Sequence, residues 1–119
     1  MKLSVTAYVK GSKEAVRFYT AAFEAELGYN HPNDDDTYMH TEIVKDNQVI
    51  LAVSENGQQL NAGDTMQFGL NLGNEESVRK AYDVLSENAK ILFPIGTSFY
   101  NELMFDLVDK YGIRWCIAV

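Results

Sequence analysis

Polar and apolar residues alternate along several short stretches of the chain, and two longer stretches follow the helical period instead. The opening run MKLSVTAYVKG, residues 1–11, alternates and predicts a first strand. Apolar residues then recur at Val16, Tyr19 and Phe23, a spacing that places them on one side of a helix. A second amphipathic helix is predicted by Val78, Ala81, Tyr82 and Leu85.

The two helical stretches open on similar sequences, which indicates an internal repeat. GSKEAVR at 11–17 reappears as GNEESVR at 73–79, each time after an alternating strand. We expect Ser12 and Asn74 to be the helix N-caps, because their side-chain oxygens can accept hydrogen bonds from free amides of the first turn. The acidic residues that follow suit the positive end of the helix dipole.

Each helix is followed by strand-like stretches that also correspond between the two halves. HTEIVKDNQVILAV at 40–53 and MFDLVDKYGIRWCIAV at 104–119 both predict a strand, a tight turn and a strand. The turns fall at the pairs Asp46-Asn47 and Tyr111-Gly112, where Asn and Gly tolerate unusual backbone angles. One more strand in each half is predicted at 26–31 and 89–93.

The repeat predicts one domain over residues 1–119, built from two βαβββ modules. Module one spans 1–54, a polar linker spans 55–64, and module two spans 65–119. The strands and helices alternate too sparsely for a doubly wound parallel sheet. We therefore expect an α+β fold with curved mixed sheets and the helices on one side of them.

Composition and charge narrow the range of partners. Apolar residues make up 46% of the chain and charged residues 23%, as in ordinary globular domains. The formal net charge is -7, and no Lys/Arg cluster offers the positive surface that phosphate backbones or anionic membranes require. No run approaches the ~20 apolar residues of a membrane span, and the start lacks a signal-peptide core. We expect a cytoplasmic protein that binds neither nucleic acid nor membrane.

Three stretches carry a resemblance to a known superfamily. They are EAVRFYTAAF at 14–23, YMHTEIVKDNQVILAVS at 38–54 and SFYNELMFDLVDKYGIRW at 98–115. With the paired βαβββ modules, they resemble the vicinal oxygen chelate superfamily of glyoxalases, bleomycin-resistance proteins and dioxygenases, and within it the PhnB-like branch. The sequence departs from that branch at Tyr100-Asn101, where Trp-Gly is usual, and at Glu24-Ala25, where glycines usually follow the helix.

The resemblance implies that each sheet packs one face on a helix and turns the other toward a cleft. Strand alternation then sorts the side chains, since neighbouring residues point to opposite faces. Apolar residues such as Ala7, Ile43 and Phe105 are assigned to the helix side. The cleft side receives Ser4, Thr6, Tyr8, His40, Glu42, Gln67, Met104, Asp106, Arg114 and Cys116.

Enzymes of the superfamily bind a divalent metal through His, Glu or Gln on the first and last strands of each module. Those positions map here to Ser4, Leu51 (or Ala52 if the register slips), Gln67 and Cys116. A hydroxyl, an aliphatic side chain, an amide and a lone thiol make a poor set of ligands. We therefore expect no metal and no cofactor at the usual site.

Three side chains could form a metal site at a different place from the usual one. His40 and Glu42 lie two apart on one strand and point to the same face, and Asp106 occupies the position equivalent to Glu42 in the second module. One imidazole and two carboxylates resemble a facial iron or manganese site. The alternatives are a His40–Glu42 hydrogen bond or direct contact with a bound ligand, and these are the expected roles.

Two cleft-side residues have further alternatives. Cys116 is the only cysteine, which excludes an intrachain disulfide, and it is expected to be an inert thiol rather than a nucleophile. Arg114 could clamp a substrate carboxylate, but a salt bridge to Asp106 or Glu102 is the expected use. Phe99 and Tyr100 could stack on a planar ligand at the mouth of the cleft, or fill a dimer interface.

The function that these observations favour is the binding of a cationic or aromatic small molecule without metal chemistry. The resemblance also leads us to expect a homodimer. No catalytic residue is assigned. The alternative is a metal-dependent lyase or dioxygenase that uses His40 and Glu42, and the third hypothesis is a dimeric scaffold. The expected ligand-binding residues are Tyr8, His40, Glu42, Gln67, Tyr100 and Asp106.

Overall fold

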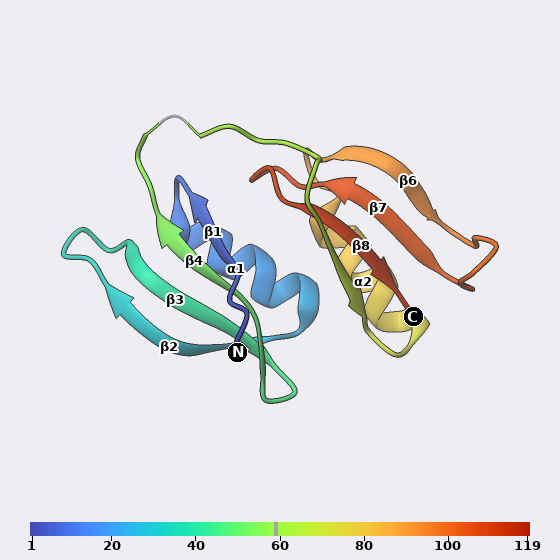
Figure 1. The fold of residues 1–119 in the computed structure, drawn as a ribbon, viewed down its shortest axis with the longest axis horizontal. Helices are drawn as coiled ribbons and strands as arrows, with labels where there is room; N and C mark the ends of the chain where they lie inside the picture. The colour runs from blue at the N-terminus through green and yellow to red at the C-terminus, as the bar shows by residue number, and fades with distance from the viewer. Residues whose placement is uncertain (59) are drawn as a thin grey trace. The chain divides into compact units, whose positions relative to one another are not determined.

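The same order of elements, βαβββ, occurs twice along the chain (Figure 1). The computed structural model describes residues 1–58 and 60–119. The first half contains β1 (Thr6–Val9), α1 (Ser12–Phe23), β2 (Glu26–Pro32), β3 (Tyr38–Lys45) and β4 (Gln48–Glu55). The second half contains β5 (Gln67–Asn71), α2 (Glu75–Leu85), β6 (Lys90–Gly96), β7 (Met104–Val108) and β8 (Arg114–Ala118).

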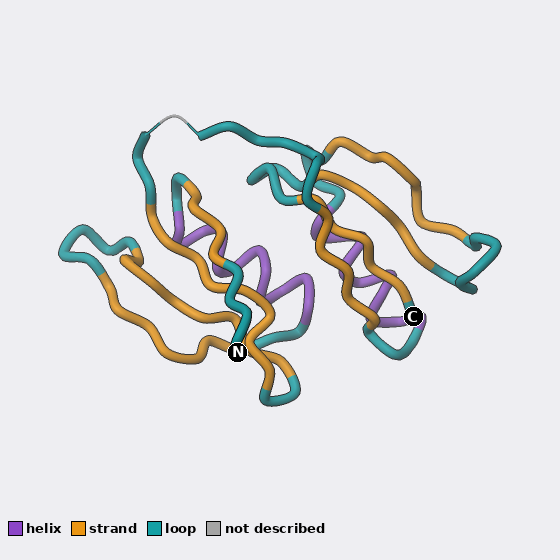
Figure 2. The backbone as a smooth tube through the Cα atoms, in the orientation of Figure 1, coloured by secondary structure: helices purple, strands orange, loops and turns teal. Residues whose placement is uncertain are grey.

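The chain divides into two compact units, Met1–Leu60 and Asn61–Val119. Each unit is a four-stranded sheet with one helix, in the strand orders β1-β4-β3-β2 and β5-β8-β7-β6 (Figure 2). The pairs β1–β4 and β5–β8 are parallel, and the other neighbouring strands are antiparallel. The predicted α+β fold with two βαβββ modules and mixed sheets is therefore confirmed.

The core of the first unit lies between α1 and one face of its sheet. Ala7, Val9 and Ile43 are buried, as alternation predicts, whereas Tyr8 between them in sequence is exposed. Tyr19 and Phe23 of the helix are fully buried with their rings stacked, 6.4 Å between centroids. Removing such side chains from water is the main favourable term in folding.

The core of the second unit follows the same rule. Phe105, Leu107 and Ile117 are fully buried on the side of α2, and Tyr82 of the helix meets Phe105 edge to face at 5.0 Å. Asp106, between two of these residues, points to the opposite face and is only partly buried. The predicted assignment of side chains to two faces is confirmed in both units.

The first turn of α1 is capped by a distant side chain, so the prediction of Ser12 as its N-cap is wrong. The N-cap residue is Gly11, at φ 85°, and it makes no side-chain capping bond. The Glu55 carboxylate at the end of β4 accepts hydrogen bonds from the amides of Gly11 (3.0 Å) and Ser12 (2.8 Å). The Ser12 hydroxyl instead accepts from the amide of Tyr38 at 2.9 Å.

The cap of α2 is the one that the sequence predicts. Asn74 has an extended backbone, and its side chain accepts a hydrogen bond from the amide of Ser77 at 2.8 Å. This bond satisfies one of the helix amides that have no partner within the helix. The repeated sequence therefore begins two helices by different local interactions.

Both predicted tight turns have left-handed residues where the sequence places them. Asp46 and Asn47 have φ of 52° and 61°, which is the backbone of the turn that best suits the twist of a hairpin. Gly112 has φ 85°, and a β-carbon there would lie 2.5 Å from that of Ala62.

In the described residues no helix is long and apolar enough to cross a membrane.

Candidate ligand-binding hollows

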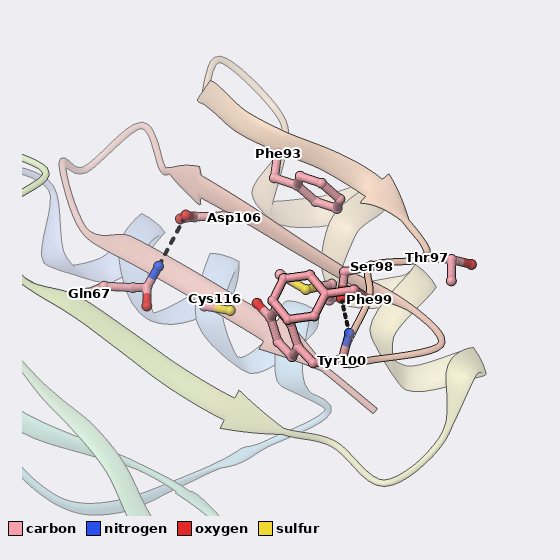
Figure 3. Close-up of a pocket in the computed structure, with 9 residues that line it drawn as sticks. Gln67, Phe93, Thr97, Ser98, Phe99, Tyr100, Asp106 and Cys116 are labelled. Atoms are coloured by element: carbon pink, nitrogen blue, oxygen red, sulfur yellow. Dashed lines mark hydrogen bonds between the residues drawn. The ribbon is translucent and has the colours of Figure 1, made fainter.

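The face of the second sheet that is turned away from α2 carries a hollow of about 380 Å³ (Figure 3). Strands β7 and β8 supply its floor through Met104, Asp106 and Cys116. Alternation brings these residues to one face because Asp106 and Cys116 are paired across the two strands. The remaining lining comes from β5, from β6 and from the loop after β6: Gln67, Phe93, Thr97, Ser98, Phe99 and Tyr100.

One corner of this hollow is a hydrogen-bonded cluster around Asp106. Arg114 donates from Nε to Oδ1 at 3.1 Å and from Nη2 to Oδ2 at 2.7 Å, in a bidentate pair. Gln67 donates from Nε2 to Oδ2 at 3.1 Å, and Arg114 Nη1 donates to the carbonyl of Asp64 at 2.7 Å. The expected Arg114–Asp106 salt bridge is confirmed, so both oxygens of this carboxylate are already engaged.

Aromatic rings form the opposite side of the hollow, as Figure 3 shows for Phe93 on β6 and for Phe99 and Tyr100 on the loop. The Phe99 and Tyr100 rings meet edge to face at 4.9 Å. Phe99 is fully exposed and Tyr100 is 60% exposed. These exposed rings therefore leave a large apolar surface at the edge of the hollow.

Hydrogen bonds at its base hold this aromatic loop in position. The Ser98 hydroxyl accepts from the amide of Asn101 at 3.1 Å, and the Asn101 side chain accepts from the amide of Leu103 at 2.9 Å. Asn101 Nδ2 also donates to the carbonyl of Val119 at 3.3 Å. Asn101, where the resembled branch usually has glycine, thus ties the loop to the end of β8.

Cys116 and Tyr100 meet at the floor of the hollow. Burial raises the pKa of the Cys116 thiol, and the nearby Asp106 charge acts in the same direction, against smaller opposing effects of Tyr100 and Arg114. Burial also raises the pKa of Tyr100, and the neighbouring thiol adds to this rise. Both groups are therefore protonated near pH 7, which agrees with an inert thiol rather than a nucleophile.

The first unit has a hollow of its own, of about 400 Å³. Strand β3 contributes His40 and Glu42, and β4 contributes Ala52 beside the chain start at Ser4 and Thr6. The distance from His40 Nε2 to Glu42 Oε2 is 3.9 Å, which is within ion-pair range and longer than a hydrogen bond. Both side chains are about one-third exposed. This hollow is more polar than that of the second unit.

Five of the six expected ligand-binding residues fall into two groups. Gln67, Tyr100 and Asp106 line the hollow of the second unit, whereas His40 and Glu42 line that of the first. Tyr8 lies on the exposed face of β1 outside these linings.

The sequence reasoning missed Phe93 as a lining residue. It pairs with Asp106 across β6 and β7, but the register shifts on both sides of it. No clean alternation along β6 could have assigned its face, because such irregularities interrupt the period of two.

The residues at the usual metal positions do not fit a metal ion. Leu51 is buried in the core, so the position facing the hollow is Ala52, as expected if the register slips. A methyl group there and the Ser4 hydroxyl make no site in the first unit, and Gln67 is already bonded to Asp106. Among the described residues, no group of three or more His, Cys, Asp or Glu side chains could hold a metal.

The fold and the paired modules agree with the comparison against protein families. Residues 3–117 match the family described as the Glyoxalase/Bleomycin resistance protein/Dioxygenase superfamily. Because this match covers nearly the whole chain, the chain belongs to that superfamily, and the predicted resemblance is confirmed. No curated protein matches the sequence.

Solved structures show the same fold at low sequence identity. A putative 3-demethylubiquinone-9 3-methyltransferase, PhnB protein, from Bacillus cereus is 22% identical with a TM-score of 0.81, covering 99% of this chain and 98% of that one. Protein PA1353 from Pseudomonas aeruginosa is 18% identical with a TM-score of 0.77, over 98% and 97% of the two chains. The fosfomycin resistance protein FosX from Mesorhizobium loti is 8% identical with a TM-score of 0.68, over 98% and 89%.

Proposed function

We propose that this protein binds a small organic molecule and does so without metal chemistry. The observation that carries the proposal is the hollow of about 380 Å³ on the second sheet, lined by aromatic rings and a few fixed polar groups. Small-molecule sites commonly have volumes of roughly 300–1,000 Å³ and this mixture of apolar wall and sparse polar groups. Tyr100, Gln67 and Asp106 are the proposed contacts in this hollow.

The first unit supports a second set of contacts. His40 and Glu42 line a hollow of similar size, and their 3.9 Å separation leaves each side chain able to bond a ligand instead of the other. Tyr8 is exposed on the same sheet and offers an aromatic surface. Superfamily membership is compatible with this role, but a fold shared by many chemistries does not select one.

The experiment that tests the proposal is a screen of small organic fragments followed by backbone amide shifts of ¹⁵N-labelled protein. We expect fragments that shift the amides of Gln67, Asp106 and Cys116, and a Tyr100→Ala variant that binds them more weakly. A Tyr29→Ala variant is the control, because Tyr29 is an exposed aromatic residue of the other unit. If no fragment shifts residues of either hollow, the binding function is wrong.

The competing function, metal-dependent catalysis at His40 and Glu42, is tested on the same protein. Metal-free protein is heated with excess Mn²⁺, Fe²⁺, Ni²⁺ or Zn²⁺, alongside a His40→Ala variant. Binding at 100-fold excess over the dissociation constant would stabilise the fold by roughly 2.7 kcal/mol. We expect no shift in melting temperature, because the described residues provide no third ligand beside this pair. A shift that disappears in the variant would favour the metal enzyme instead.

We also propose that the protein is a homodimer. The supporting observation is the apolar edge strand β6, where Ile91 and Leu92 are 39% and 37% exposed. Exposed apolar patches on a sheet edge are typical of surfaces that associate. Sedimentation velocity should give a mass about twice that of the 13.4 kDa monomer. A protein that is still a monomer at a concentration of roughly 100 μM would exclude a stable dimer.

A further inference from the structure

We infer that the hollow of the second unit takes an uncharged, planar aromatic molecule that donates a hydrogen bond, and that Gln67 accepts this bond. The inference rests on the proposed binding function and specifies its ligand. It also departs from the expectation of a cationic ligand, which follows from the net charge of the chain. Three features support it: the neutralised carboxylate of Asp106, the aromatic lining and the orientation of the Gln67 amide.

Asp106 is the one formally charged side chain among the described residues that line this hollow. Arg114 neutralises it through two hydrogen bonds, and Gln67 supplies a third. A ligand cation would have to compete with a bidentate guanidinium for the same two oxygens. The carboxylate therefore gives a cation little net attraction.

The other titratable groups at the floor are neutral as well. The pKa of Cys116 and that of Tyr100 are both raised by burial, so neither group adds a negative charge near pH 7. The remaining polar lining, Thr97 and Ser98, consists of neutral hydroxyls. A charged ligand would lose its hydration here without an unpaired opposite charge in return.

Aromatic side chains from two different elements line the hollow. Phe93 on β6 and the Phe99-Tyr100 pair on the loop all expose ring surface (Figure 3). Rings such as these attract a flat aromatic molecule by offset or edge-to-face contact, in addition to the gain from the area buried. Ser98 and Asn101 hold the loop in position, so these rings need not be ordered anew for each binding event.

The side-chain amide of Gln67 is oriented by its hydrogen bond to Asp106. Asp106 can only accept, so the Gln67 nitrogen must face it, at 3.1 Å. The Gln67 oxygen is consequently turned away from Asp106, as Figure 3 shows. An oxygen presented in this way accepts a hydrogen bond, so the ligand should bring an N–H or O–H group to this corner.

Three naphthalene probes of matched size test the inference: 2-naphthol, 2-methoxynaphthalene and 2-naphthylmethylammonium. They are titrated at pH 7 into the full chain, with the amide shifts of Gln67 and Cys116 as the readout. We expect 2-naphthol to bind about fivefold more tightly than the ether, since a net hydrogen bond is worth about 1 kcal/mol. The ammonium probe should bind no better than the ether.

Two variants at the same exposed position separate the parts of the inference. Gln67→Leu should remove the preference for 2-naphthol over the ether while both still bind. Gln67→Glu adds a carboxylate without a bidentate partner and should shift the preference toward the ammonium probe.

Several results would overturn the inference. These are tighter binding of the ammonium probe to the unmodified protein, or equal binding of naphthol and ether. If fragments of another class occupy this hollow while all three naphthalenes fail, the ligand class is wrong and the binding function stands. If no fragment binds either hollow, both are wrong.

Discussion

The Asp109 carboxylate organises the turn between β7 and β8. Its Oδ1 accepts from the amides of Tyr111 (2.8 Å) and Ile113 (3.1 Å), and its Oδ2 accepts from the buried indole of Trp115 at 2.9 Å. Asp109 itself is only 4% exposed. The stretch DKYGIRW at 109–115 therefore has a structural role at its first and last residues.

Replacing this carboxylate should strongly destabilise the protein. In Asp109→Ala, three donors lose their acceptor, two of them backbone amides and one a buried indole, so we expect a loss of about 3 kcal/mol in the free energy of unfolding. Urea titration followed by fluorescence measures this change, because Trp115 is the only tryptophan.

The conservative variant Asp109→Asn provides the control for that measurement. It keeps the shape and one acceptor oxygen, so it should lose clearly less stability than the alanine variant. Equal losses in the two variants would show that negative charge, rather than the number of acceptors, is what the turn requires. No loss in either variant would contradict the structural role of Asp109.

Glu24 ends α1 in a conformation that favours glycine. Its φ and ψ are 51° and 46°, and its amide donates to the carbonyl of Thr20. A side chain in this left-handed region costs roughly 1–2 kcal/mol, which glycine avoids. This backbone requirement accounts for the glycines that the resembled branch usually has after this helix.

Glu24→Gly should accordingly be more stable than Glu24→Ala, by about 1 kcal/mol. The alanine variant removes the same side-chain interactions but keeps the β-carbon, so the difference between the two variants isolates the backbone effect. Thermal unfolding monitored by circular dichroism is sufficient. Equal melting temperatures would mean that the left-handed conformation of residue 24 carries no strain.

Helix α1 depends on Glu55, which lies on β4 and more than forty residues away in sequence. Partial burial acts to raise the pKa of Glu55, but hydrogen bonds from Ser12 and Gly11 outweigh it, and the pKa is lowered from its usual 4.5. A lowered pKa stabilises the folded state above the unfolded value, and this contribution disappears as the pH falls through the folded pKa. Acid should therefore weaken this end of the helix.

Glu55→Gln should test this dependence on pH. At pH 7 we expect the variant to be about 1 kcal/mol less stable, since the charged cap of the helix is lost. The difference should shrink as the pH falls below 4.5, the usual pKa of the carboxyl in the unfolded chain, and should disappear below the lowered pKa of the folded protein. Urea titrations at pH 7 and at pH 3 give both values.

Glu26→Gln on β2 is the matched control for that experiment, because it removes one exposed negative charge that is not at the N-terminal end of the helix. It should show little change at either pH. A difference between Glu55→Gln and wild type that stays constant with pH would assign the effect to shape rather than charge.

Local sequence pattern was sufficient for the elements and for the faces of side chains on the regular strands. Ile43, Phe105 and Trp115 are buried where alternation places them, because a strand has a fixed period of two. The capping role of Glu55 was not predictable, since it joins residues brought together only by the parallel pairing of β1 and β4. Similarly, Ala52 replaces Leu51 at the hollow in a strand pair that contains a register shift.

The sequence predicted which side chains face away from the helices, but not which of them would contact one another. Alternation turns Glu42 and Asp106 away from the helices of their units, as the structure confirms. Their surroundings depend on distant residues, however. Asp106 is neutralised by Arg114 and bonded by Gln67, whereas the ion-pair contact found for Glu42 among the described residues is the 3.9 Å one to His40. No local pattern distinguishes these two environments.

The charges of the whole chain are unfavourable for binding nucleic acid. Acidic residues outnumber basic ones by 17 to 10. Several of the basic side chains are also held within 4 Å of a carboxylate, and these include Lys13, Lys90, Lys110 and Arg114. Phosphate binding requires basic side chains that are both clustered and available.

We therefore expect no binding to a fluorescently labelled DNA duplex at pH 7.5 and 0.15 M salt, even at tens of micromolar protein, roughly the range of non-specific affinities. Fluorescence anisotropy measures this directly, and a single-stranded RNA of the same length extends the test. A rise in anisotropy that weakens steeply with salt would show that the protein binds phosphate groups electrostatically. That result would contradict the expectation drawn from the excess of acidic residues.

The alternation of side chains in each sheet has a consequence for how such a protein can change over generations. Residues such as Phe105 and Ile117 hold the fold, while the residues between them, Asp106 and Cys116, face the hollow. Substitutions at every second position can therefore alter what is bound without disturbing the core. Because the module occurs twice, one copy can acquire new specificity while selection maintains the other.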